Sequence, residues 1–343
     1  MSKKSILKAR VILGLMLFIA AIAIYAGAFS LSPSSNGLAD EINFVDITLQ
    51  NPSSSIGIVG LGDVSFEQLP QVVRHIPGPF RVSYEYVEQL LDFNYISNRI
   101  FLADPSTVLL PSDIDVLAFL EKDLTIDLDV DGPQVLIFHT HSLEEFVDSR
   151  WDDPMSGIMG VGAYLADVLR ERHGIEVLHY TGRFDVVSGI PQRPGSYERM
   201  EPVIRQILAD NPSIQIVIDL HRDGIPESHP PLVTYINGVR TAQIMFFNGL
   251  SRRYRNGIIT NLDWLVNPYQ RENLAFSFNL QLAANSLYPG IARRIYLREF
   301  RYSLHMAPLS TLIEVGAQNN TFQEAINAMY PLSDIIAAVV LKE

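Results

Sequence analysis

The sequence predicts an α/β fold, in which helices cover the faces of a sheet, preceded by a transmembrane helix. From residue 135 onward, short apolar runs of strand length alternate with amphipathic segments of helical period. Near the N-terminus, an unbroken apolar run extends from residue 11 to residue 29. The chain has 343 residues, of which 48% are hydrophobic, so it has ample apolar surface to build a core.

The first 29 residues combine a basic tail, residues 1–10, with the apolar run of residues 11–29. As a helix this run would be about 28 Å long, close to the hydrocarbon thickness of a bilayer. The basic flank predicts a cytoplasmic N-terminus and a body outside the cell membrane. A cleaved signal peptide is the alternative, because Ala26-Gly27-Ala28 resembles a cleavage site, although the run is longer than a typical signal-peptide core. We therefore expect a single-pass membrane protein.

Composition excludes several classes of function. The chain has no cysteine, which excludes disulfides, thiol catalysis and cysteine-ligated metal sites. Any metal ligands must therefore be His, Asp or Glu. The net charge is −12 although the first 29 residues are basic, so the body is strongly acidic and poorly suited to nucleic acid.

Residues 30–131 form a predicted linker and accessory region. The segment after the apolar run is rich in Ser and Pro, and the remainder shows a short helix at about residues 114–124 but no chemical motif. We expect the catalytic domain to comprise residues 132–343. Its predicted strands are residues 135–138, 175–180, 214–220, 243–247 and 311–315. Its predicted helices are residues 159–169, 202–209 and 267–287, and a last helix that a capping box opens at Thr321 and that Pro331 should kink.

Three of these strands end in ionisable residues. The first runs into His139-Thr-His-Ser-Leu-Glu144, the third into His221-Arg222-Asp223, and the last carries Glu314. Ligands of open α/β sheets bind at the carboxyl ends of strands, so we expect these segments to converge. Ionisable groups at the ends of buried strands are costly unless they are paired or bound to metal.

The spacing predicts a zinc site at this edge of the sheet. His141 and Glu144, three residues apart, can hold one cation, and His221 would complete the two-His, one-Glu set of catalytic zinc hydrolases. Glu314 would be the general base, because flanking aliphatic residues desolvate its carboxylate and raise its pKa. Arg222 is a candidate donor to the oxyanion of the transition state.

Alternatives remain open for several of these residues. His139 could be the ligand in place of His141, or a substrate or ligand-supporting contact, although the spacing to Glu144 favours His141. His305 either approaches the site or lies on a surface loop. Glu314 could instead form a structural ion pair with Arg301 or Arg294.

Taken in order, these motifs resemble the stage II sporulation protein P family. The resemblance rests on four segments, namely VLIFHTHSLE (135–144), IDLHRDG (218–224), RYSLH (301–305) and LIEVG (312–316). The segments 289–293 and 319–321 also fit. One departure lies between Tyr180 and Glu198, where the family usually carries a His-Asp pair and a Tyr-rich stretch.

The resemblance implies a zinc-dependent peptidoglycan hydrolase of endospore formers. Such proteins act as N-acetylmuramoyl-L-alanine amidases and as endopeptidases on stem-peptide cross-links, in septal wall thinning and engulfment. Their implied partners are stage II sporulation proteins D and M. The implied fold is that of zinc amidases and carboxypeptidases, a mixed, mostly parallel sheet with helices on both faces. Zn²⁺ would fall on the HTHxxE segment and His221, with Glu314 catalytic.

Two other functions fit parts of the sequence. A zinc carboxypeptidase would need an arginine placed to bind the terminal carboxylate of a peptide. A membrane-tethered module that binds wall or partner without catalysis would not need the full set of His141, Glu144, His221 and Glu314, which this chain retains.

Overall fold

The computed structural model describes residues 83–150 and 152–342. The expected membrane anchor at residues 11–29 lies outside these ranges. Among the helices in the described ranges, none is both long enough and apolar enough to cross a bilayer.

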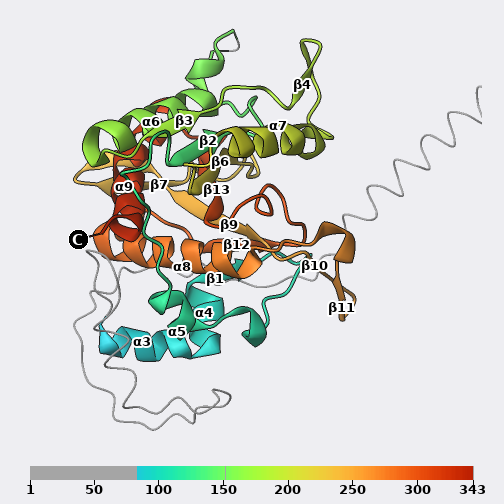
Figure 1. The fold of residues 1–343 in the computed structure, drawn as a ribbon, viewed down its shortest axis with the longest axis vertical. Coiled ribbons are helices and arrows are strands. Elements are labelled where there is room, and N and C mark those ends of the chain that lie inside the picture. Colours follow the sequence, from blue (N-terminus) through green and yellow to red (C-terminus); the bar gives the residue numbers. More distant parts are fainter. Residues whose placement is uncertain (1–82, 151, 343) are drawn as a thin grey trace, which may run out of the picture. The chain divides into compact units, whose positions relative to one another are not determined.

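Seven strands of the described chain form one central sheet (Figure 1). In spatial order they are β1 (Phe101–Ala103), β12 (Ile295–Arg298), β9 (Ile244–Gly249), β13 (Ser310–Ala317), β6 (Ile216–Asp223), β2 (Val135–Phe138) and β3 (Val177–His179). Neighbouring strands are parallel except for β13 and β9, which are antiparallel. The predicted mixed, mostly parallel sheet is confirmed, and the five predicted strands all form.

Helices cover both faces of this sheet, as predicted. On one face, Val135 and Ile137 of β2 join the large core that also holds α6 (Ile158–His173), α8 (Gln270–Leu287) and α9 (Phe322–Val340). On the other face, Leu136 and Phe138 pack with α7 (Ser196–Asp210). Strands of a parallel sheet are apolar on both sides for this reason, which is why they appear in the sequence as continuous hydrophobic runs.

The helix ends follow the sequence signals closely, with one exception. Thr321 and Glu324 form the predicted capping box of α9, which continues through Pro331 to Val340 as one helix. The helix α7 begins at Ser196, six residues before the predicted start at Pro202, and contains that proline in its interior. The six added residues place Tyr197 and Glu201 on this helix, and the Tyr197 ring packs edge-on against His141, which follows β2.

The sheet extends beyond the predicted boundary of the domain at residue 132. The strand β1 pairs with β12, and α5 (Val116–Glu121) contacts α8 in the same core. Therefore β1 shares the sheet, and α5 shares the core, of the predicted domain at residues 132–343. A three-residue edge strand is too short to show periodicity, so the sequence did not predict it.

The remaining elements lie outside the central sheet. Two helices, α3 (Tyr84–Leu91) and α4 (Phe93–Arg99), precede β1. The other strands form three hairpins, β4–β5 (Val186–Val187, Ile190–Pro191), β7–β8 (Val233–Ile236, Val239–Ala242) and β10–β11 (Arg252–Arg255, Ile258–Asn261).

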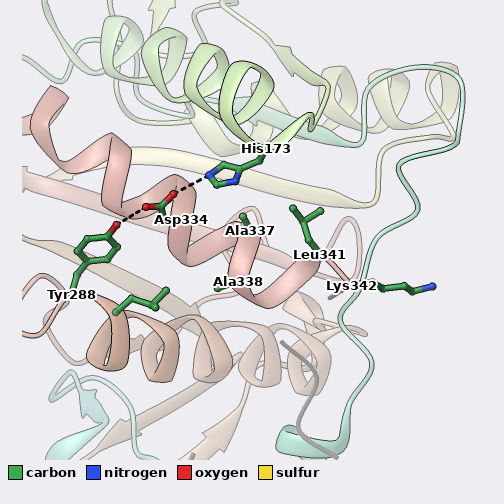
Figure 2. Close-up of a pocket in the computed structure, with 8 residues that line it drawn as sticks. His173, Tyr288, Asp334, Ala337, Ala338, Leu341 and Lys342 are labelled. Atoms are coloured by element: carbon green, nitrogen blue, oxygen red, sulfur yellow. Dashed lines mark hydrogen bonds and ion pairs between the residues drawn. The ribbon is translucent and has the colours of Figure 1, made fainter. Parts of the chain in front are cut away.

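A pocket of about 500 Å³ lies between α6, α8 and α9 (Figure 2). On one wall, the Asp334 carboxylate accepts a hydrogen bond from the Tyr288 hydroxyl and lies 3.1 Å from His173 Nε2. His173 ends α6, just before β3 begins, so this pocket lies at the amino-terminal edge of the parallel strands. The ionisable strand ends lie at the opposite edge.

Candidate metal centre

Three of the predicted residues meet at the carboxyl-terminal edge of the sheet, where His141 and Glu144 follow β2 and His221 lies near the end of β6. One ligand atom of each of His141, Glu144 and His221 lies within 4.8 Å of the others, and all three side chains are buried. His141 Nδ1 is 3.4 Å from Glu144 Oε1, and His221 Nδ1 is 3.2 Å from Glu144 Oε2. Ligands of a tetrahedral zinc ion with bonds of about 2.0–2.1 Å stand at about this separation. Since His141 Nδ1 also has no hydrogen-bond partner among the described residues, the set fits zinc.

The carboxylate of Glu144 is oriented from both sides. The backbone N–H of Arg222 donates to Oε2 at 2.9 Å, and Arg193 Nη2 donates to Oε1 at 2.9 Å. Burial raises the pKa of Glu144, but the charge of His221 and the close approach of the His141 and His221 rings outweigh it and hold that pKa well below its usual value. Glu144 is therefore an anion in the interior of the protein, as a metal ligand must be.

The second histidine, His221, is oriented by an acid on the same strand. Asp219 and His221 are two residues apart on β6 and so face the same side of the sheet. His221 Nε2 lies 2.7 Å from Asp219 Oδ1, and Asp219 also accepts hydrogen bonds from the N–H and hydroxyl of Thr140. Burial lowers the pKa of His221, but the charges of Asp219 and Glu144 raise it well above its usual value.

The predicted base, Glu314, lies next to the candidate metal ligands. It is the direct partner of His221 in the parallel register of β13 and β6. Its Oε2 is buried without a hydrogen-bond partner among the described residues. Burial raises the pKa of Glu314 to about 8, with a further contribution from Glu144, although the charge of His221 opposes the shift.

The ion pairs considered for Glu314 do not form. Arg301 instead pairs with Glu201 at 3.1 Å, and Arg294 donates to the carbonyl of Asn98 at 3.0 Å. Glu314 thus keeps a free carboxylate oxygen beside the cluster.

The structure distinguishes His139 from His141. The strand β2 ends at Phe138, so the two histidines do not continue its alternation, and His139 lies on the α6 side against Gly162. His139 Nδ1 donates to the carbonyl of Leu220 at 2.7 Å, and its Nε2 is 2.9 Å from His179 Nε2. Burial and the neighbouring His179 lower the pKa of His139 to about 4. His139 is therefore neutral, fully buried and outside the metal cluster.

Arg222 and His305 make contacts other than those expected. The guanidinium of Arg222 donates to the carbonyl of Glu145 at 2.8 Å, while its backbone holds Glu144. His305 is buried, and its Nε2 lies 3.0 Å from Glu201 on α7. His305 therefore joins the loop after β12 to α7 and is not among the clustered ligands.

Sequence reasoning missed three residues at the site. Asp219 could have been found, since it lies two residues before His221 in a predicted strand. The Tyr197 ring lies edge-on to His141, with 5.5 Å between ring centroids. It was missed because the predicted start of α7, at Pro202, left Tyr197 outside the helix. Arg193 comes from an irregular segment, where no periodic pattern indicates which side chain turns inward.

Comparison with solved structures gives weak overall similarity. An N-acetylmuramoyl-L-alanine amidase from Clostridium difficile 630 is 17% identical, with a TM-score of 0.36, over 61% of this chain and 94% of that chain. The CwlD amidase from Clostridioides difficile, solved in complex with the GerS lipoprotein, is 13% identical, with a TM-score of 0.35, over 60% of this chain and 98% of that chain.

Comparison with known sequences identifies the family more specifically than comparison with solved structures does. The stage II sporulation protein P of Bacillus subtilis (strain 168) is 23% identical over 234 residues, which are 63% of this chain and 53% of the relative. This chain thus matches about half the length of that curated relative. The sequence profile of the family described as stage II sporulation protein P matches residues 100–337, a range that contains every residue of the candidate metal centre. The chain therefore belongs to the stage II sporulation protein P family.

Proposed function

We propose that this protein is a zinc-dependent peptidoglycan hydrolase that acts as an N-acetylmuramoyl-L-alanine amidase. The observation that carries the proposal is the position of a free, buried carboxylate oxygen of Glu314 beside three clustered ligands, His141, Glu144 and His221. Membership of the stage II sporulation protein P family supports the proposed class of substrate.

The residues of the site divide the chemistry between them. When bound, zinc would polarise the scissile carbonyl and lower the pKa of the attacking water. Glu314 accepts the proton of that water at its free oxygen while the hydroxide adds to the carbonyl carbon. As the C–N bond breaks, Glu314 returns the proton to the leaving nitrogen. A carboxyl whose pKa is about 8 exchanges protons readily in both directions near neutral pH.

The same site supports cleavage of the amide bonds of stem-peptide cross-links, so we include endopeptidase activity in the proposal. We further propose that residues 11–29 hold the enzyme in the cell membrane with its catalytic domain outside, where it would meet the septal wall during endospore formation. Stage II sporulation proteins D and M are the proposed partners, from the family resemblance.

The test uses the full chain, purified in detergent and supplied with isolated cell walls. We expect one zinc per chain by elemental analysis, wall digestion that stops with chelator and resumes with zinc, and released glycans with free lactyl groups together with free stem peptides. Products shortened only at a peptide C-terminus would favour a carboxypeptidase instead. Undiminished digestion by a metal-free preparation would refute the metal mechanism, and wall binding without products would leave only a binding module.

A further inference from the structure

The segment between β3 and α7, residues 180–195, lies against the metal centre and is the region that departs from the family pattern. Asp185, which is buried within it, accepts a hydrogen bond from the Ser142 hydroxyl at 2.5 Å and another from the Leu143 N–H at 2.9 Å. These bonds join the segment directly to the HTHSLE motif, residues 139–144, at the two positions between the proposed ligands His141 and Glu144.

Arg199 of α7 fixes the shape of this segment. Its guanidinium donates to three backbone carbonyls, those of Phe184 at 2.7 Å, Gln192 at 2.5 Å and Pro194 at 3.1 Å. The Gln192 N–H also donates to the Asp185 carbonyl at 2.7 Å. The segment is therefore a defined wall of the site.

Two arginines of this wall reach the motif and keep donors available. Arg193 donates one hydrogen bond, to Glu144, while its side chain is 60% exposed. Arg183, also exposed, donates from Nε to the Ser142 hydroxyl at 3.2 Å. A guanidinium has five N–H donors, so each arginine has further donors for a ligand at the entrance to the site. The two guanidinium groups place positive charge at this wall of the site, in a chain whose net charge is −12.

We propose that Arg193 and Arg183 bind a carboxylate of the peptide substrate close to the scissile amide. The inference rests on the proposed function and adds the chemical group that the enzyme recognises. Guanidinium groups bind carboxylates with paired, charge-assisted hydrogen bonds, which fix the distance between the anion and the bond to be cleaved. Peptidoglycan in which this carboxylate is free is the preferred substrate, and peptidoglycan in which it is amidated is a poor one.

The experiment compares two synthetic muropeptides that differ only in whether the peptide carboxylate nearest the scissile amide is free or converted to carboxamide. Wild type is compared with Arg193→Gln, Arg193→Lys and Arg183→Gln. The control is Arg271→Gln, a similarly exposed arginine on α8 that pairs with Asp115 far from the motif. Zinc content is measured for every variant, because Arg193 also contacts Glu144.

We expect Arg193→Gln to raise KM for the free carboxylate about tenfold relative to KM for the carboxamide, in addition to any change that both substrates share through the contact of Arg193 with Glu144. Arg193→Lys should recover part of the affinity, and Arg271→Gln should behave as wild type. Equal losses on both substrates, or a loss that follows zinc content, would overturn the proposal and leave Arg193 as a support for Glu144.

The two proposals can fail separately. If wild type cleaves neither muropeptide, the proposed amidase function is wrong for these substrates, and equilibrium binding by calorimetry then decides the present inference. Tighter binding of the free carboxylate that Arg193→Gln abolishes would sustain it. Equal binding of both muropeptides would refute it.

Discussion

His221 Nε2 lies 2.7 Å from Asp219 Oδ1, two residues earlier on the same strand. The bond assigns the Nε2 proton to the side facing Asp219, so Nδ1 faces Glu144 and would offer its lone pair to a metal ion that displaces its proton. Carboxylates in this position raise the basicity of a metal-binding imidazole and hold its ring in place.

Asp219→Asn should therefore weaken zinc binding by about 10- to 100-fold, because the neutral amide no longer supports the imidazole. Competition with a chromophoric chelator measures the affinity. The matched control is Asp334→Asn, which alters another His–Asp pair at the opposite edge of the sheet. Unchanged zinc affinity in Asp219→Asn, with normal folding, would contradict the role of Asp219.

Glu314→Gln should retain zinc and lose about 10²- to 10⁴-fold in kcat, because a positioned base is removed while the ligands remain. Elemental analysis and initial rates of wall digestion, on the same preparation, separate the two effects. His221→Ala should lose both zinc and activity. If Glu314→Gln lost zinc as well, Glu314 would be a ligand and the base would have to be sought elsewhere.

Gly162→Ala should destabilise the protein by about 1–3 kcal/mol through overpacking. An added Cβ would lie 2.7 Å from Cε1 and Nε2 of His139 and 3.0 Å from His179 Nε2. His139 cannot yield easily, since it is buried and bonded at both ring nitrogens. Denaturant unfolding measures the change. Gly224→Ala, where a Cβ meets nothing within 4 Å, should be close to neutral, and equal effects of the two substitutions would refute the argument.

Stability should fall in acid partly through Glu201. Burial raises its pKa, but hydrogen bonds from His305 and Arg205 and the charge of Arg301 together lower it to about 2. A carboxyl with a depressed folded-state pKa stabilises the protein above its unfolded pKa of about 4.5, and this contribution is lost as pH falls toward 2. The difference in unfolding free energy between wild type and Glu201→Gln should thus shrink between pH 6 and pH 3. A difference that stayed constant over this range would show that Glu201 is not stabilised as an anion.

Much of the fold could be predicted because its strands are buried on both faces. Continuous apolar runs such as residues 135–138 identify these strands, and polar residues directly after them identify the functional edge. The strand β12 was not predicted, because its alternate residues, Tyr296 and Arg298, are only half-buried and interrupt the apolar run. Local patterns also do not reveal that β13 runs antiparallel to β9, since strand direction is decided by packing of distant segments.

The main residues of the candidate site could be predicted for the same reason as the strands. His141, Glu144, His221 and Glu314 follow or lie in buried strands, so their convergence follows from the topology of the sheet. The choice between His139 and His141 depended on the residue at which β2 ends, which periodicity locates poorly. Arg193 reaches Glu144 from an irregular wall, and only the folded chain shows that contact.

The pairing of Glu314 with His221 across β13 and β6 determines when the proposed site can be complete. A shift of one residue between these strands would turn Glu314 to the opposite face. β13 is the last strand of the sheet in chain order, so a chain that ends before Ser310 would lack Glu314, the proposed proton acceptor. Because His141, Glu144 and His221 all precede Ser310 in the chain, the proposed base is the last of these four residues to be synthesised.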